Sequence, residues 1–155
     1  MKQTHNGYTM IELLVVMTII LILGTLGFIA YGYANASGRD SRRKSDIEQL
    51  RSALEFYRSD NGFYPDPSSG SSASFVAVDS ALHDAIVTGG YMSQLPSDPK
   101  DNVANPYKII LTDGRGTPMH YYGYCLAAKL ESSAATNSNC STALTEDYNY
   151  GVKNP

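Results

Sequence analysis

The sequence contains 155 residues, of which 17% are charged and 43% are hydrophobic, and its formal charge is −3 at pH 7. This balance excludes a strongly basic nucleic-acid binder and a disordered, highly charged chain. The average hides an asymmetry, because no charged residue occurs in the 26 residues from Leu13 to Gly38. The sequence therefore predicts an apolar first segment followed by a water-soluble body.

The apolar segment allows three interpretations: a membrane-spanning helix, a cleaved signal peptide or a buried core helix. A core helix is disfavoured because only two threonines between residues 13 and 30 are polar and no apolar stripe is visible. As a helix, the segment would extend about 39 Å, more than a hydrocarbon layer of ~30 Å. Ala34-Asn35-Ala36 and the basic start favour a signal peptide, but the length of the segment and Glu12 argue against one.

Glu12 lies at the entry of this segment, where a charge is costly in lipid and is therefore a candidate functional group. A structural interpretation competes with this one. Thr9-Met10-Ile11-Glu12 fits the capping box, in which the glutamate reaches back to the backbone N–H of the threonine. A carboxylate in the first turn also suits the helix dipole. The local sequence alone favours the cap.

A longer motif surrounds Glu12: a short basic leader with Lys2, then Gly7, then Tyr-Thr-Met-Ile-Glu-Leu-Leu-Val-Val over residues 8–16. This motif resembles the class III leader of type IV pilins and type II secretion pseudopilins. The resemblance implies that a prepilin peptidase removes residues 1–7 by cutting between Gly7 and Tyr8 on the cytoplasmic side. It also implies that the new amino terminus of Tyr8 is methylated, although members usually carry Phe at this place.

Cleavage there would make Glu12 the fifth residue of the product, in lipid and with no obvious partner in its own chain. The cationic amine of Tyr8 on a neighbouring subunit is a suitable partner. Pairing two otherwise uncompensated charges in a low dielectric favours one axial offset between subunits. Glu12 is therefore predicted to direct assembly, and residues 8–38 are assigned to a transmembrane and filament-core helix.

An amphipathic spine helix is predicted over residues 39–60. Its end is marked by Asn61-Gly62, and its apolar face consists of Ile47, Leu50, Leu54 and Tyr57. The cluster Arg42-Arg43-Lys44 is interpreted either as a contact for anionic lipid or DNA phosphate or, preferably, as a solvated face offset by nearby carboxylates. Four cations within residues 39–44 also favour the cytoplasmic side of the membrane for this end of the apolar segment.

Residues 61–155 are predicted to form a globular head, because turn signals separate a short helix and three strands. The fold class is therefore α+β: a long N-terminal helix packed against a small antiparallel sheet, as in type IV pilins. The first predicted element is a helix over Asp79–Thr88, with Leu82 and Ile86 pointing inward. Strands are predicted over Tyr107–Thr112, Met119–Leu130 and Tyr148–Val152, and a turn over Asp113–Gly116 separates the first two. One face of the middle strand carries Tyr122, Tyr124, Leu126, Ala128 and Leu130.

A second resemblance covers residues 39–110. The pattern resembles the major pseudopilins of type II secretion and comprises Leu54, Tyr57, Asp60, Gly62, Tyr64-Pro65, Tyr91, Leu95-Pro96 and Asp98-Pro99. Those proteins usually bind calcium through an acidic C-terminal loop after a Gly-x-Asp-Gly element, which is missing here. Asp98, Asp101 and Asp113 are candidate oxygen ligands, but they lack a recognisable calcium spacing and are interpreted as turn residues. No metal or other cofactor is predicted.

Cys125 and Cys140 occur in place of that loop. Type IV pilins often close a C-terminal loop with a disulfide, so the resemblance implies a bond between these residues, which would require an oxidising compartment. Two free thiols are the alternative. A zinc site is disfavoured because the three histidines are isolated and no Cys-x-x-Cys occurs.

The sequence carries no nucleotide-binding or hydrolase motif, and it predicts a structural, non-catalytic protein. The resemblance implies a homo-oligomeric subunit of a type IV pilus-like filament, processed by prepilin peptidase. Its further partners would be membrane lipid before assembly, an inner-membrane assembly platform and minor pilins, whereas nucleic acid is not required. The expected location is the bacterial inner membrane, then an extracellular or periplasmic filament. The alternatives are a type II secretion pseudopilin, a DNA-uptake pilus subunit and, from another class, a membrane-tethered or secreted binding domain that never polymerises.

Overall fold

The computed structural model describes residues 7–66, 76–78, 82–100, 106–132, 137–138, 140 and 148–154. The chain divides into two compact units, residues 1–36 and 37–155, here called unit 1 and unit 2. Helix α1 (Met10–Asn61) contributes residues to both units. The other elements belong to unit 2 and are β1 (Val76–Ala77), η1 (His83–Thr88), β2 (Lys108–Arg115), β3 (His120–Ala128), β4 (Asn137–Ser138) and β5 (Tyr150–Lys153).

The first part of α1 makes up most of unit 1. By length and composition alone this helix could cross a membrane, and none of its most apolar 18-residue window is buried within the chain. Between residues 13 and 30 the only polar side chains are those of Thr18 and Thr25. Both are satisfied locally, because their hydroxyls donate to the carbonyl oxygens of Val15 and Ile22 at 2.7 and 2.8 Å. The apolar surface of this stretch is therefore not interrupted by an unpaired hydroxyl group.

The later part of α1 forms one wall of the core of unit 2. Ile47, Leu50 and Leu54 are buried and Tyr57 packs against the same core, which confirms the predicted apolar face. The helix ends at Asn61, as the Asn-Gly signal predicts. Gly62 follows with φ +84°, a left-handed conformation that favours glycine, and its N–H donates to a carbonyl oxygen in the last turn.

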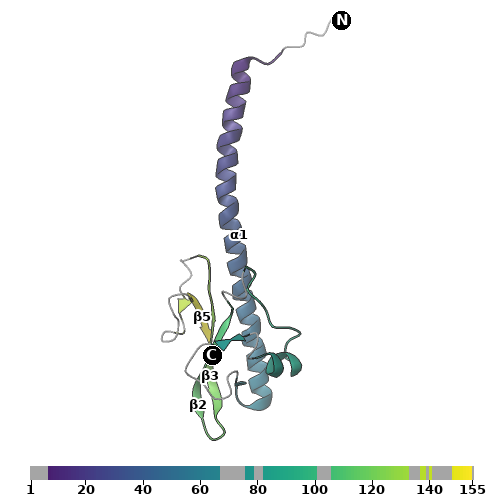
Figure 1. Ribbon diagram of the computed structural model, residues 1–155, viewed down its shortest axis with the longest axis vertical. Helices are drawn as coiled ribbons and strands as arrows, with labels where there is room; N and C mark the ends of the chain where they lie inside the picture. Colours follow the sequence, from purple (N-terminus) through teal and green to yellow (C-terminus); the bar gives the residue numbers. More distant parts are fainter. Residues whose placement is uncertain are drawn as a thin grey trace. The chain divides into compact units, whose positions relative to one another are not determined.

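The sheet lies beside this part of α1 (Figure 1) and has the strand order β1-β2-β3-β5-β4. Neighbouring strands are antiparallel from β1 to β5, so the predicted α+β fold with a small antiparallel sheet is confirmed. The short β4 was not predicted and pairs in parallel with β5. The core fills the space between helix and sheet and includes Leu111, Tyr124, Leu126 and Val152.

The predicted turn at Asp113–Gly116 is wrong in position. Strand β2 continues to Arg115, and the connecting turn begins at Gly116, which has φ +84°. Asp113 adopts φ +56° inside the strand, a conformation that aspartate tolerates better than most residues. The ladder therefore continues through Asp113, with Thr112 opposite Gly123 and Gly114 opposite Tyr121.

Strand β3 follows the predicted alternation only in part. Tyr124, Leu126 and Ala128 are buried in the core as expected, whereas Tyr122 is half-buried. Tyr121, which the alternation places on the other face, also joins the core and forms an isolated bridge with Tyr64.

Within the predicted helix over residues 79–88, the described residues form the π-helical segment η1, which begins at His83. Leu82 and Ile86 are buried, as predicted. Residues 79–81 lie outside the described residues. The segment stops at the predicted Gly89-Gly90 pair, where Gly90 adopts φ +82°.

Candidate assembly site

The first turn of α1 closes on itself through Thr9 and Glu12. The Glu12 Oε2 atom accepts the Thr9 backbone N–H at 2.8 Å and the Thr9 hydroxyl at 2.7 Å. In return, the Glu12 N–H donates to the Thr9 Oγ1 atom at 3.3 Å. These are the reciprocal contacts of a capping box, so the structural interpretation of Glu12 is confirmed.

This geometry corrects one prediction about Glu12. The side chain does have a partner in its own chain, because a glutamate at this position can reach back to a threonine that has not yet entered the helix. Both accepted hydrogen bonds end on Oε2. Among the residues that the structure describes, no cation pairs with this carboxylate. The cap therefore satisfies one oxygen atom and leaves the negative charge uncompensated.

The surface around Glu12 is apolar and concave. A depression of about 590 Å³ is lined by Tyr8, Ile11, Glu12, Leu13, Val15 and Val16. The Tyr8 side chain is 85% exposed, and Gly7 and Tyr8 precede the first helical residue, Met10. The peptide bond between Gly7 and Tyr8 therefore lies in non-helical, accessible chain, while the nearby carboxylate lies in an apolar setting.

A second polar site, in unit 2, is built around Arg43, whose side chain is 2% exposed. Its Nε and Nη2 atoms donate to the two carboxylate oxygens of Asp98 at 2.6 and 3.0 Å. Its Nη1 atom donates to Asp40 at 2.8 Å and to Glu131 at 3.0 Å. A buried guanidinium thus ties α1 to two later segments of the chain through charge-assisted hydrogen bonds.

Two interpretations were predicted for the Arg42-Arg43-Lys44 cluster, a contact for lipid or phosphate and a solvated face. For Arg43 both are wrong. Arg43 is neither solvated nor available to lipid or phosphate, because three carboxylates surround it. Arg42 and Lys44 are exposed, and the Lys44 ammonium lies 5.7 Å from the ring centre of Tyr150.

The carboxylate of Glu131 is strongly perturbed by the same network. Hydrogen bonds from Arg39, at 2.6 Å, and from Arg43 lower its pKa to about 2, and Lys100 adds to the effect. The backbone N–H groups of Glu131 and Ser132 in turn donate to Asp40 at 2.9 Å. The segment after β3 is therefore held against α1 by charge and by backbone hydrogen bonds together.

The core of unit 2 holds further polar contacts made by tyrosines. Burial and a hydrogen bond donated to Asp46 at 2.7 Å raise the pKa of Tyr107 well above its usual range. Burial and the nearby carboxylate of Glu55 do the same for the pKa of Tyr124, whose hydroxyl donates to that carboxylate at 3.1 Å. These hydroxyls remain neutral donors at ordinary pH.

A disulfide joins Cys125 on β3 to Cys140, with the two Cα atoms 6.0 Å apart. Both residues are buried. The bond expected from the resemblance to type IV pilins is therefore present in the structure, and it closes the segment after β3 back onto the sheet.

Two of the three aspartates considered as metal ligands make other contacts. Asp98 accepts from Arg43 and from the backbone N–H of Lys100, and Asp113 accepts from Arg115 at 2.8 and 3.0 Å. Asp101 lies outside the described residues. Within the part of the chain that the structure describes, no group of three potential metal-ligating side chains occurs.

The comparisons with known families agree on two regions of the chain. The model for protein G of the type II secretion system matches residues 32–121, and the model for the prokaryotic N-terminal methylation motif matches residues 2–28. The second match contains Gly7, Tyr8 and Glu12, the residues of the candidate assembly site.

Curated relatives carry the same description. The type II secretion system core protein G of Aeromonas hydrophila is 32% identical over 111 residues, which cover 70% of this chain and 75% of that protein. The protein of the same name from Vibrio cholerae is 30% identical over 118 residues, covering 75% and 76%. The one from Escherichia coli is 33% identical over 103 residues, covering 63% and 68%. No solved structure matches the chain.

The pilin-like class expected from the leader is thereby confirmed, and within that class the matches support the type II secretion alternative. The protein G model covers more than half of the sequence, and the relatives from Aeromonas and Vibrio are matched over about three quarters of their length. The chain therefore belongs to the type II secretion system protein G family and is a pilin-like pseudopilin.

Proposed function

We propose that this chain is the structural subunit of a type II secretion pseudopilus and has no catalytic role of its own. The observation that carries the proposal is an uncompensated carboxylate, Glu12, at the start of an apolar helix that is exposed from Met10 to Asn35. That surface is stable only in lipid or against other apolar helices, because burying it from water is worth about 25 cal/mol per Å².

Prepilin peptidase is proposed to cut between Gly7 and Tyr8 and to methylate the new amine of Tyr8. The match to the N-terminal methylation motif supports this step, and so does the accessible, non-helical chain at the cleavage position. Intact-mass and N-terminal analysis of protein from membranes tests it. A product starting at methylated Tyr8 is expected, whereas a start at Met1 or at Ser37 would refute it, the latter indicating a signal peptidase.

Assembly is proposed to pair the Glu12 carboxylate with the Tyr8 amine of an adjacent copy. The capping contacts occupy Oε2, so Oε1 remains open to the incoming cation. An ion pair formed in an apolar, low-dielectric setting is strong relative to a surface pair, and leaving one partner unpaired there is costly. The pair would thus fix the axial offset between neighbouring helices.

Substitutions of Glu12 separate this role from helix capping. Glu12→Ala and Glu12→Val should block filament formation but leave membrane insertion and cleavage intact. Glu12→Gln provides the sharper comparison, because glutamine can preserve the capping contacts while removing the charge. Thr9→Ala is the matched control, since it removes the capping hydroxyl and keeps the charge.

Filament yield after shearing is measured for each variant together with the assembly machinery. The pairing model expects Glu12→Gln to fail and Thr9→Ala to assemble. Normal yield with Glu12→Gln, together with failure of Thr9→Ala, would show that the cap and not the charge is required.

The surroundings of the subunit form part of the proposal. Lipid of the inner membrane would hold unit 1 before assembly, an inner-membrane platform would extract it, minor pseudopilins would contact the filament, and unit 2 would lie in the periplasm. A type IV pilus or DNA-uptake filament is the second candidate, because the leader and helix suit any of these machines. The protein G match favours the pseudopilus.

A further inference from the structure

Unit 2 carries a cleft between the last turns of α1 and the turn that follows η1. Its volume is about 410 Å³, and it is lined by Phe56, Ser59, Asp60, Gly89, Gly90 and Tyr91; we call it the Phe56–Asp60 cleft. One wall has no side chains because two glycines form it. Gly89 is closely packed, since an added Cβ would meet the carbonyl oxygen of Ala85 and would lie 3.0 Å from the Tyr91 ring.

The chemistry of this cleft suits a cation. Asp60 supplies a carboxylate that also accepts the Tyr91 hydroxyl at 3.1 Å, and the C-terminal end of a helix adds partial negative charge. The Phe56 ring is 64% exposed, and aromatic faces attract ammonium groups. Among the described residues of unit 2, Phe56 and Met119 are the large hydrophobic side chains that remain exposed. A ring, a carboxylate and a helix end thus converge without a cation of their own.

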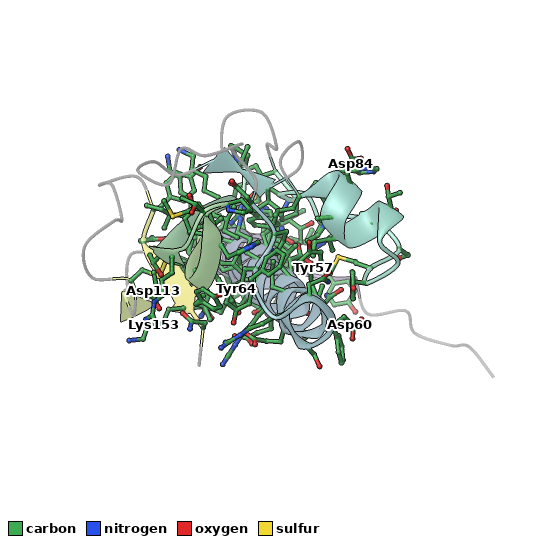
Figure 2. All side chains as sticks on the ribbon, turned by 90° about the horizontal axis from the view of Figure 1, so that it is seen from below. Tyr57, Asp60, Tyr64, Asp84, Asp113 and Lys153 are labelled. Carbon is green, nitrogen blue, oxygen red and sulfur yellow. A yellow bond between two sulfur atoms is a disulfide. The ribbon has the colours of Figure 1, made fainter. Side chains whose placement is uncertain are left out.

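Only two described cations of unit 2 have no hydrogen-bond, ion-pair or ring partner: Arg42 and Lys153. Arg42 precedes Asp60 on α1 by about five turns at 3.6 residues per turn, so the two side chains point to the same side of the helix. Figure 2 shows Lys153, at the end of β5, on the side of the molecule opposite to Asp60.

Neighbouring copies in parallel orientation can meet repeatedly only through surfaces that face opposite directions. Lys153 and the cleft satisfy this condition, whereas Arg42 and the cleft do not. We propose that Lys153 of one copy enters the Phe56–Asp60 cleft of the next copy, where it pairs with Asp60 and lies against Phe56. This contact rests on the proposed filament function. It is heterologous, so it leaves a free lysine at one end of the row and a free cleft at the other.

Zero-length coupling of assembled full-length filaments with a carbodiimide tests the contact directly. The reagent joins an amine to an adjacent carboxylate, and peptide mass spectrometry should identify Lys153 linked to Asp60. Because these residues lie on opposite sides of one copy, the link must come from two copies. Lys153→Arg is the matched control: it keeps the charge and the filament yield but removes the coupling. Filaments in which no such link forms would overturn the proposal.

Charge reversal provides the second measurement. Lys153→Glu and Asp60→Lys should each lower filament yield about five- to tenfold, the range expected for one ion pair with an aromatic contact. Combining the two should restore the yield, which a folding defect would not allow. Arg42→Glu and Asp84→Lys make the same charge changes at exposed positions outside the contact and should have little effect.

The outcomes separate this contact from the proposed function. If wild-type filaments form and Lys153→Glu is neutral, or the double reversal restores nothing, the contact is refuted and the pseudopilus assignment stands. If the wild-type chain forms no filament with its assembly machinery, the proposed function and the contact both fall.

Discussion

Replacing Arg43 with methionine is expected to lower the free energy of unfolding of unit 2 by about 3–5 kcal/mol, the cost of breaking a buried ion pair by removing one partner. The Asp98 side chain is fully buried and that of Asp40 is 6% exposed, so neither carboxylate could recover its lost contacts from water. Four hydrogen bonds disappear, two of them in a bidentate pair. Methionine is long enough to fill much of the vacated space, so the loss reports charge and not a cavity.

Thermal unfolding of the full chain in detergent, followed by circular dichroism, measures this loss. At roughly 3–6 °C per kcal/mol for a domain of this size, the midpoint should fall by about 10–25 °C. Arg51→Met is the control, because its pair with Glu48, at 3.4 Å, is partly exposed and worth about 0–1 kcal/mol. Adding Asp98→Asn to Arg43→Met should recover part of the stability. A loss below about 1 kcal/mol for Arg43→Met would refute the reasoning, because it would place the network with ordinary surface pairs.

Three further predictions concern unit 2. The folded pKa of Glu131 is about 2 and its ordinary value is 4.5, so its stabilising effect is fully present above about pH 4.5 and disappears as the pH falls through 2. In urea unfolding, Glu131→Gln should therefore be less stable than wild type at pH 7 and similar to wild type at pH 2. Gly89→Ala should cost about 1–3 kcal/mol because its Cβ would meet a carbonyl oxygen of η1, whereas Gly38→Ala, on an open helix surface, should be neutral or slightly stabilising in the same assay. Reduction, or replacement of Cys125 and Cys140 by alanine, should lower the stability by about 3 kcal/mol, and an unchanged urea midpoint under reducing conditions would contradict this.

The parts of the fold that periodicity determines could be predicted from the sequence. The apolar face of the spine helix, its end at Asn61 and the inward positions Leu82 and Ile86 all depend on local spacing and on turn residues. The turn between β2 and β3 could not be placed correctly in this way. Asp-Gly is a strong turn signal, yet here Asp113 takes a positive φ inside the ladder and the chain reverses three residues later.

The buried polar network could not be predicted, because charged residues are rarely buried unless they are paired and its pairs are distant in sequence. Asp98 and Glu131 lie 55 and 88 residues from Arg43. The sequence does contain one signal, since Asp40 and Arg43 are three residues apart, on the side of the helix that also buries Ile47. Two opposite charges on the apolar face of a helix indicate a buried salt bridge. Its other partners are brought close only by the tertiary fold.

The site at Glu12 shows a different limit. A single motif specifies both the cap and the leader, and one copy of the chain displays only the cap. Any pairing with a second copy involves two chains, so no pattern within one sequence specifies it, and the filament yields of the Glu12 variants test it.

The burial of Arg43 also bears on how unit 2 would stay on one side of a membrane. Before folding, the cations of residues 39–44 would act against the proposed export, because positive charge next to an apolar helix tends to remain in the cytoplasm. Folding occupies two of them, Arg39 and Arg43, with carboxylates that follow much later in the chain. For unit 2 to return to the cytoplasm, these ion pairs would first have to break. Folding on the far side of the membrane would therefore oppose backward movement of the chain.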